Sequence, residues 1–183
     1  QGLVFAGAVN LPEKDTFLQA ELFLPRGTAK IQGVVVILHH GDLSSQLFYN
    51  AEFRRMVAQA GCVAVLTSVR HMQGPQPNRP IEAEVIRNAA AGGGEGVILL
   101  LDQLARSTSH HELGSAPILF WGFSAAASFG TTFAGLHPDR TVGFVRYHTH
   151  RRGLPASVGA LTQLPALLIA GGQDQGAGFE DAE

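Results

Sequence analysis

The chain has 183 residues, 45% of them hydrophobic and 15% charged, and its mean hydropathy of +0.12 predicts one soluble globular domain spanning residues 1–183. The formal net charge of −2 leaves no basic surface that could gather phosphates, which excludes nucleic acid and an anionic membrane as partners. A single cysteine, Cys62, excludes an internal disulfide and a thiolate zinc cluster, and no apolar run approaches the ~20 residues of a membrane span.

The first two apolar segments, LVFAGAVNL (3–11) and FLQAELFLP (17–25), lie close together in the sequence. The polar stretch PEKD (12–15) between them is typical of a turn. The pattern predicts an antiparallel hairpin at the edge of a sheet.

Five further apolar runs follow, and each is short and nearly continuous. Such runs are typical of strands that helices cover on both faces, so they predict the core strands of a mostly parallel sheet. The runs are 33–38 (GVVVIL), 62–68 (CVAVLTS), 117–121 (PILFW), 141–147 (TVGFVRY) and 165–170 (PALLIA).

Helical segments alternate with these strands. One crossover helix is predicted from the capping serines Ser44 and Ser45 to Gly61. Residues 80–106 are predicted to be mainly helical, in two pieces divided by the glycines at 92–94. A third helix is predicted over 125–136, before Pro138. The alternation places the chain in the α/β class.

Ser124 stands where a predicted strand meets a predicted helix, in the stretch FWGFSAAASFG. Gly122 and Ala126 flank it at a spacing of two, and a sharp turn there requires small residues on both sides of an exposed central serine. The start of the following helix would favour negative charge developing beside the hydroxyl. The motif predicts a nucleophilic serine, while a serine that only caps a helix is the structural alternative.

Two other predicted strands also end in polar residues. The run 33–38 leads into His39 and His40, followed by Gly41 and Asp42, where a loop amide could join the amide of Ala125 in an oxyanion hole. His39 and His40 could instead be buried, hydrogen-bonded structural histidines, and for His40 this interpretation is preferred to a direct catalytic role. Asp174 follows the last strand, where a carboxylate could orient a histidine or simply form a turn.

The order of these elements and the phrases HHGD, SAPILFWGFSAAASFG, HPDR and LPALLIAGGQD resemble the α/β-hydrolases over nearly the whole chain, and most of all the esterase branch with polyhydroxybutyrate depolymerases and feruloyl esterases. The resemblance implies an N-terminal antiparallel hairpin and helices on both faces of the sheet. It also implies that Ser124 is the nucleophile, Asp174 the acid of the triad, and Ala125 with Asp42 or Leu43 the oxyanion donors.

The sequence departs from that family at two places. Ala126 replaces the usual glycine after the serine, which adds one methyl group. In the family a histidine follows the acid, whereas no histidine follows His150 here, so a last strand, the histidine loop and a final helix are expected to be missing. The base is therefore expected from outside these residues, with His148 as a substitute one strand away from Ser124.

These features predict a serine carboxylic ester hydrolase that acts through an acyl-enzyme on short-acyl, hydroxycinnamate or polymer esters and needs no cofactor or metal. Only RRGLPASVGALTQ separates the last two strands, which predicts an open site without a lid. Arg70, His71 and Arg79 lie at or beyond the end of one strand, where they could contact a substrate.

Two alternatives stay open: a non-catalytic binding module on the same fold, and a metal-dependent hydrolase built on His148 and His150 with His71 or Asp42. A homodimer through the unpaired last strand is a further prediction. The chain begins with Gln1 and has no signal-peptide pattern, so a secreted, periplasmic or cytoplasmic location stays open.

Overall fold

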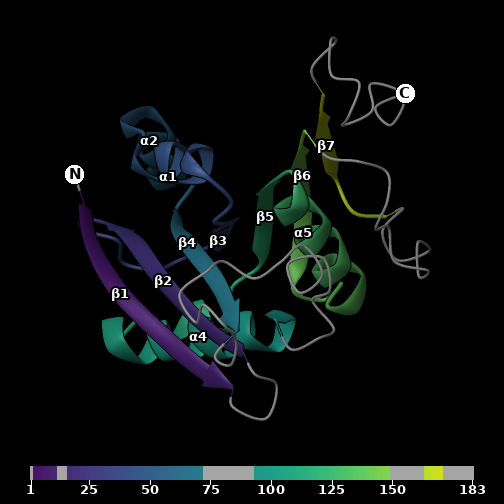
Figure 1. The fold of residues 1–183 in the computed structure, drawn as a ribbon. Helices are drawn as coiled ribbons and strands as arrows, with labels where there is room; N and C mark the ends of the chain where they lie inside the picture. The colour runs from purple at the N-terminus through teal and green to yellow at the C-terminus, as the bar shows by residue number, and fades with distance from the viewer. Residues whose placement is uncertain (1, 12–15, 72–92, 149–162, 171–183) are drawn as a thin grey trace.

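The computed structural model describes residues 2–11, 16–71, 93–148 and 163–170, and these residues form a seven-stranded sheet with the order β1-β2-β4-β3-β5-β6-β7 (Figure 1). The strands are β1 (Gly2–Leu11), β2 (Thr16–Pro25), β3 (Gly33–Leu38), β4 (Cys62–His71), β5 (Ile118–Phe123), β6 (Thr141–Tyr147) and β7 (Ala166–Ile169). The helices are α1 (Asp42–Tyr49), α2 (Ala51–Gln59), α4 (Gly93–Thr108) and α5 (Ala125–Leu136), with a 3₁₀ helix η3 (His111–Gly114).

The predicted N-terminal hairpin is confirmed. β1 pairs antiparallel with β2 along its whole length and forms one edge of the sheet, and β2 pairs antiparallel with β4. β4, β3, β5, β6 and β7 run parallel to one another. The mixed, mostly parallel sheet predicted from the sequence is therefore present, while the turn at 12–15 lies outside the described residues.

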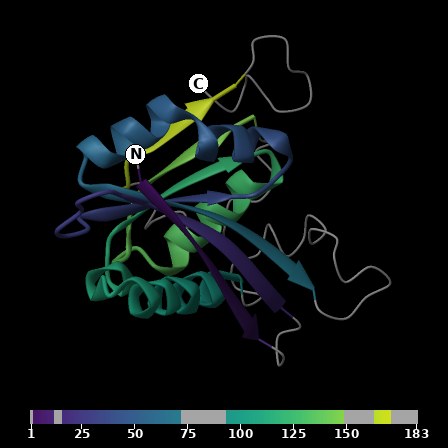
Figure 2. The same ribbon diagram turned by 90° about the vertical axis from the view of Figure 1, so that its left-hand side faces the viewer.

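Helices lie on both faces of the sheet, with α1 and α2 on one face and α4 and α5 on the other (Figure 2). The alternation of side chains along β2 divides the core accordingly. Leu18 and Leu22 are fully buried in the cluster that includes α4 and α5, whereas Phe23 is buried with Phe48 of α1 and Val57 of α2. The sheet is thus the middle of three layers.

The single helix predicted between β3 and β4 is wrong, because the structure has two. Asn50 ends α1 and caps α2: its backbone is extended, and its side-chain oxygen accepts a hydrogen bond of 2.9 Å from the Phe53 N–H. An asparagine side chain that caps a helix favours a break at its own position. The spacing of apolar residues does not reveal such a break. The predicted end is confirmed, since Gly61 follows α2 with a φ of +67°.

The predicted start of that helix is also wrong. α1 begins at Asp42 after Gly41, and Ser44 lies within its first turn, fully buried. The Ser44 hydroxyl accepts a bond of 3.0 Å from the His40 N–H and donates one of 3.2 Å to the Leu38 carbonyl. Ser44 therefore fixes the loop that leaves β3 instead of capping the helix.

Among the described residues, β7 is the unpaired edge strand expected from the missing last strand, although its apolar run is typical of a core strand. It lies at the edge of the described sheet with β6 as its neighbour, and all four of its residues are exposed, Leu167 by 55%. An apolar run predicts a strand but not the number of its neighbours. Dimerisation through this edge stays a prediction.

The remaining boundaries agree closely with the sequence. α5 has the predicted bounds, α4 begins within the predicted glycine break, and the region 80–92 lies outside the described residues. β4 runs three residues beyond the predicted 68, to His71. The short helix η3 was not predicted.

Glu112 of η3 ties this helix to the segment that enters β3. Its Oε1 accepts a hydrogen bond of 2.9 Å from the Ile31 N–H and lies 3.0 Å from Nδ1 of His110. The bond from Ile31, followed by those from its own N–H and from His110, lowers the pKa of Glu112 to about 2. This carboxylate therefore stabilises the fold in its charged form.

Replacing Glu112 with glutamine should reduce the loss of stability in acid. The folded-state pKa lies below the unfolded value of about 4.3, so the stabilisation is complete above that pH and disappears as the pH falls towards 2. Because the side chain is partly exposed, the effect should be modest. Between about pH 5 and 2.5, we expect the free energy of unfolding, measured with urea, to fall by about 1 kcal/mol less in Glu112→Gln than in the wild type. Asp139→Asn, in an exposed turn, is the control, and parallel curves for wild type and Glu112→Gln would contradict the assignment.

Candidate functional site

Ser124 occupies a strained turn between β5 and α5. Its φ of 54° and ψ of −124° lie in a region that residues with a side chain rarely adopt, at a cost of about 1–3 kcal/mol. Two backbone bonds hold it there: its N–H donates to the Tyr147 carbonyl over 2.9 Å, and its carbonyl accepts from the Ala127 N–H over 3.1 Å. The strand-turn-helix context predicted for this serine is present, and the residue is partly exposed.

The small residues around Ser124 let α5 approach β5 closely. A Cβ atom placed on Gly122 would lie 2.5 Å from both the Cα and the N of Ala127. Ala126 is 1% exposed and packs into the main hydrophobic cluster. The requirement for a small residue is therefore met on both sides, and the extra methyl of Ala126 is accommodated.

A second loop reaches the same edge of the sheet. β3 and β5 are parallel neighbours, so the segment after β3 and the turn after β5 both leave at the carboxyl ends of their strands. Asp42, Leu43 and Ala125 lie in the first turns of α1 and α5, where backbone N–H groups have no acceptor within the helix. The structure thus places the three predicted oxyanion residues at the edge of the sheet where Ser124 also lies.

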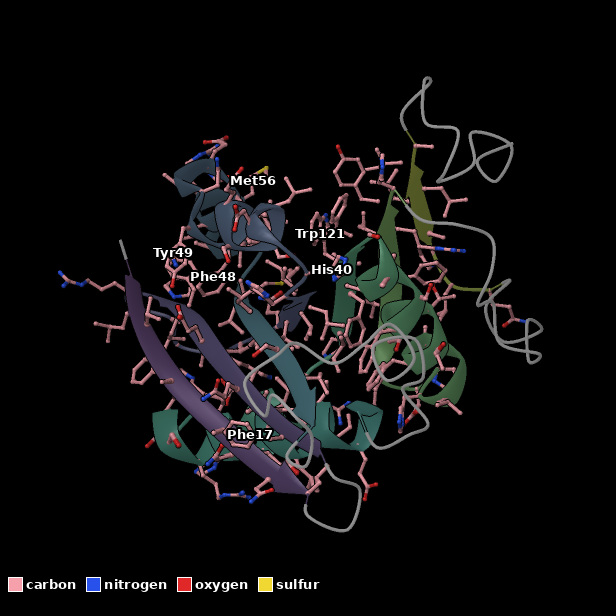
Figure 3. The ribbon with its side chains drawn as sticks, viewed as in Figure 1. Phe17, His40, Phe48, Tyr49, Met56 and Trp121 are labelled. Atoms are coloured by element: carbon pink, nitrogen blue, oxygen red, sulfur yellow. The ribbon has the colours of Figure 1, made fainter. Side chains whose placement is uncertain are left out.

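Aromatic rings surround the residue that precedes Ser124. The Phe123 ring lies 5.6 Å from that of Tyr147 and 6.1 Å from that of His40, between centroids, and the Trp121 ring lies 6.4 Å from that of Tyr147. Trp121, a residue of β5, packs against the cluster that α1 and α2 cover, and His40 lies close to it (Figure 3). Burial, and then the neighbouring His39, lowers the pKa of His40, which keeps its imidazole neutral near pH 7.

This ring cluster was not predicted from the sequence. The sequence does place Trp121 and Phe123 two residues apart in a strand, which puts both rings on one face of β5. The pairing of Phe123 with Tyr147 on β6 then adds the third ring. All of these rings are partly exposed, so they form an apolar surface beside the serine.

His148 lies at the end of β6, the strand paired with β5, as predicted. Its φ is 55°, its N–H donates to the Ile169 carbonyl over 2.8 Å, and its ring lies 5.6 Å from that of Phe123. The structure therefore places this histidine at the same edge as Ser124, and its role as a base stays a prediction.

The other predicted site residues are not described by the structure. Asp174, Arg79 and His150 lie outside the described residues, and Arg70 and His71 end β4 without described side chains. Across the ranges that are described, no three histidine, cysteine, aspartate or glutamate side chains gather as a metal site. None of the described helices is long and apolar enough to cross a membrane.

Similar solved structures place this arrangement in a known fold. A dienelactone hydrolase from Anabaena variabilis is 18% identical with a TM-score of 0.60 over 94% of this chain and 74% of its own. A thermostable esterase is 12% identical with a TM-score of 0.58 over 90% of this chain, which spans only 45% of that esterase. An α/β serine hydrolase homologue from Coxiella burnetii is 17% identical with a TM-score of 0.55, and the match covers 97% of this chain and 78% of that homologue.

No protein-family model matches the chain, and no curated protein is significantly similar to it in sequence. The class of the protein therefore follows from its sheet order, its helices on both faces and its structural neighbours. The chain has the α/β-hydrolase fold, as the resemblance implied.

Replacing Gly122 with alanine should disrupt the turn. The added Cβ would meet the backbone of Ala127, which cannot move without shifting α5, so we expect a loss of about 2–4 kcal/mol in the free energy of unfolding. Gly27→Ala is the matched control: Gly27 has a φ of +77° but nothing within 4 Å of an added Cβ, so it should lose only about 1 kcal/mol. Urea denaturation measures both, and equal losses would show that the contact with α5 is not close.

Proposed function

We propose that the protein hydrolyses carboxylic esters through an acyl-enzyme formed on Ser124. The observation that carries this proposal is the strained backbone of Ser124 at the junction of β5 and α5. Such strain persists where the surrounding structure holds a reactive group in place. The esterases and the dienelactone hydrolase among the structural neighbours support the same class of reaction.

In the proposed reaction, the Ser124 oxygen forms a bond to the ester carbonyl carbon while its proton passes to a histidine. The N–H of Ala125 and that of Asp42 or Leu43 donate to the carbonyl oxygen as it becomes negative. Collapse of this intermediate expels the alcohol, which takes the proton from the histidine, and leaves the acyl-enzyme. Water then attacks the acyl-enzyme in the same way, which releases the acid and regenerates Ser124. Asp174 is the proposed partner of that histidine.

The ring cluster supports substrates with an apolar or planar acyl group. Trp121, Phe123 and Tyr147 present partly exposed rings next to Ser124, and stacked rings favour flat hydrocarbon groups. This agrees with the proposed hydroxycinnamate, short-acyl or polymer esters, and Arg70, His71 and Arg79 are proposed to contact the rest of the substrate. A binding module without catalysis on the same fold is the alternative.

A fluorophosphonate probe tests for an activated serine directly. Attack by the Ser124 oxygen forms a bond to phosphorus and releases fluoride, so we expect one adduct in the intact mass. Ser124→Ala should abolish this adduct, whereas Ser107→Ala, at an exposed serine of α4, should leave it unchanged. Absence of the adduct in the wild-type protein would mean that these residues do not supply the base that activates Ser124.

Replacing His148 with glutamine tests the substitute base. If His148 takes the Ser124 proton, removal of its imidazole should slow labelling by about 100-fold or more. His111→Gln, at an exposed histidine of η3, is the matched control and should label at the wild-type rate. An unchanged rate in His148→Gln would remove His148 from the proposed mechanism, and the rates are measured from the growth of the adduct mass with time.

A further inference from the structure

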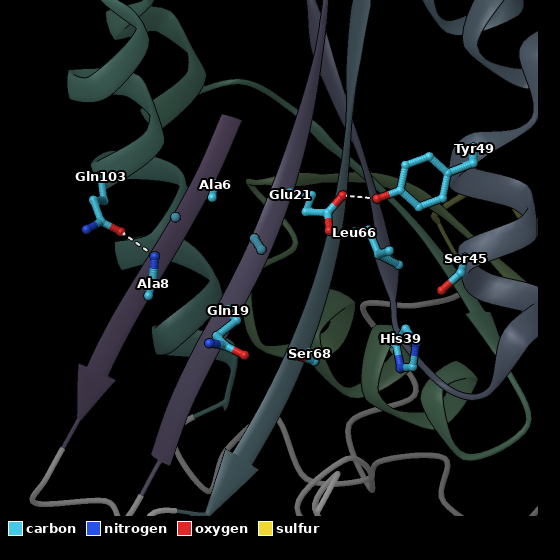
Figure 4. Close-up of a pocket in the computed structure, with 12 residues that line it drawn as sticks. Ala6, Ala8, Gln19, Glu21, His39, Ser45, Tyr49, Leu66, Ser68 and Gln103 are labelled. Carbon is cyan, nitrogen blue, oxygen red and sulfur yellow. Dashed lines mark hydrogen bonds between the residues drawn. The ribbon is translucent and has the colours of Figure 1, made fainter. Parts of the chain in front are cut away.

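A hollow of about 630 Å³ lies over β1, β2 and β4, between α1 and Gln103 of α4 (Figure 4). β1, β2 and β4 form its floor, α1 forms one wall, and His39 closes it where the chain leaves β3. Its volume is within the range of about 300–1,000 Å³ that small-molecule sites occupy. The catalytic proposal uses none of the side chains that line it.

Several polar side chains line this hollow. Gln19, His39, Ser45 and Ser68 line it, and within the described part of the chain none of these four side chains makes a hydrogen bond. Glu21 also lines it, and among the described residues its one side-chain hydrogen bond is accepted by Oε2 from the hydroxyl of Tyr49. The hollow thus offers hydroxyl, amide, imidazole and carboxylate groups to a ligand.

The chemistry of the lining narrows the class of ligand. No lysine or arginine is among the described residues that line the hollow, and the Glu21 carboxylate repels an anion. The mixture of donors and acceptors suits a group that both donates and accepts, such as a row of hydroxyls. Ala6, Ala8 and Leu66 leave small apolar areas between the polar groups, against which C–H groups can pack.

We propose that this hollow binds a neutral, polyhydroxylated ligand of one or two sugar rings. A sugar combines hydroxyl groups for the polar side chains with C–H faces for the alanines, and it carries no charge that Glu21 would repel. The site neighbours the proposed ester site, because His39 lines the hollow while His40, the next residue, contacts Phe123. Binding there does not depend on Ser124.

Titration of the ¹⁵N-labelled protein with cellobiose tests the proposal. We expect saturable shifts of backbone amides confined to the hollow, centred on Ala8, Gln19 and Ser68, with millimolar affinity. Cellobionate, which carries one carboxylate on the same scaffold, should bind more weakly because of Glu21. Gln19→Ala should weaken cellobiose binding by about fivefold to tenfold, the effect of about one hydrogen bond.

Gln59→Ala is the matched control, since Gln59 is exposed at the end of α2 and does not line the hollow. Shifts that do not saturate, an equal effect of Gln19→Ala and Gln59→Ala, or tighter binding of cellobionate would each overturn the proposal. Ser124→Ala should bind cellobiose as the wild type does. Failure of sugar binding and failure of serine labelling are therefore separate results.

Discussion

The close approach of α5 to β5 is the constraint on which the rest of the site depends. Because Gly122 has no side chain, the backbone of Ala127 comes within 2.5 Å of where a Cβ would lie, and the chain must turn within one residue. That residue is Ser124, which accepts an unfavourable φ, while the β6 carbonyl of Tyr147 holds its N–H. The same turn starts α5 beside the hydroxyl, so strain, exposure and helix polarity have one origin.

The parallel ladder then gathers residues that are far apart in the sequence. β3, β5 and β6 are neighbours in one direction, so the loop at 40–43, the turn at 124 and 125, and His148 all leave the same edge of the sheet. A shift in pairing would separate them. This edge is where ligands bind in open α/β sheets, and here the ladder alone brings the proposed nucleophile and the proposed oxyanion donors together.

The features that depend on chain-wide periodicity were predictable, and those that depend on single contacts were not. Apolar runs predicted every strand of the sheet, and the glycine, serine and alanine spacing predicted the strained turn. The break at Asn50 arises from one side-chain bond, and the role of Ser44 arises from two bonds to the loop after β3. The exposure of β7 is set by its neighbours in space, about which its own sequence carries no information.

The loop after β3 links the two proposed sites. His39 lines the hollow, and the ring of the next residue, His40, lies 6.1 Å from that of Phe123. Ser44 binds both the His40 N–H and the Leu38 carbonyl, which restrains this segment at its two ends. A ligand against His39 therefore contacts the same short loop that presents the proposed oxyanion donors Asp42 and Leu43.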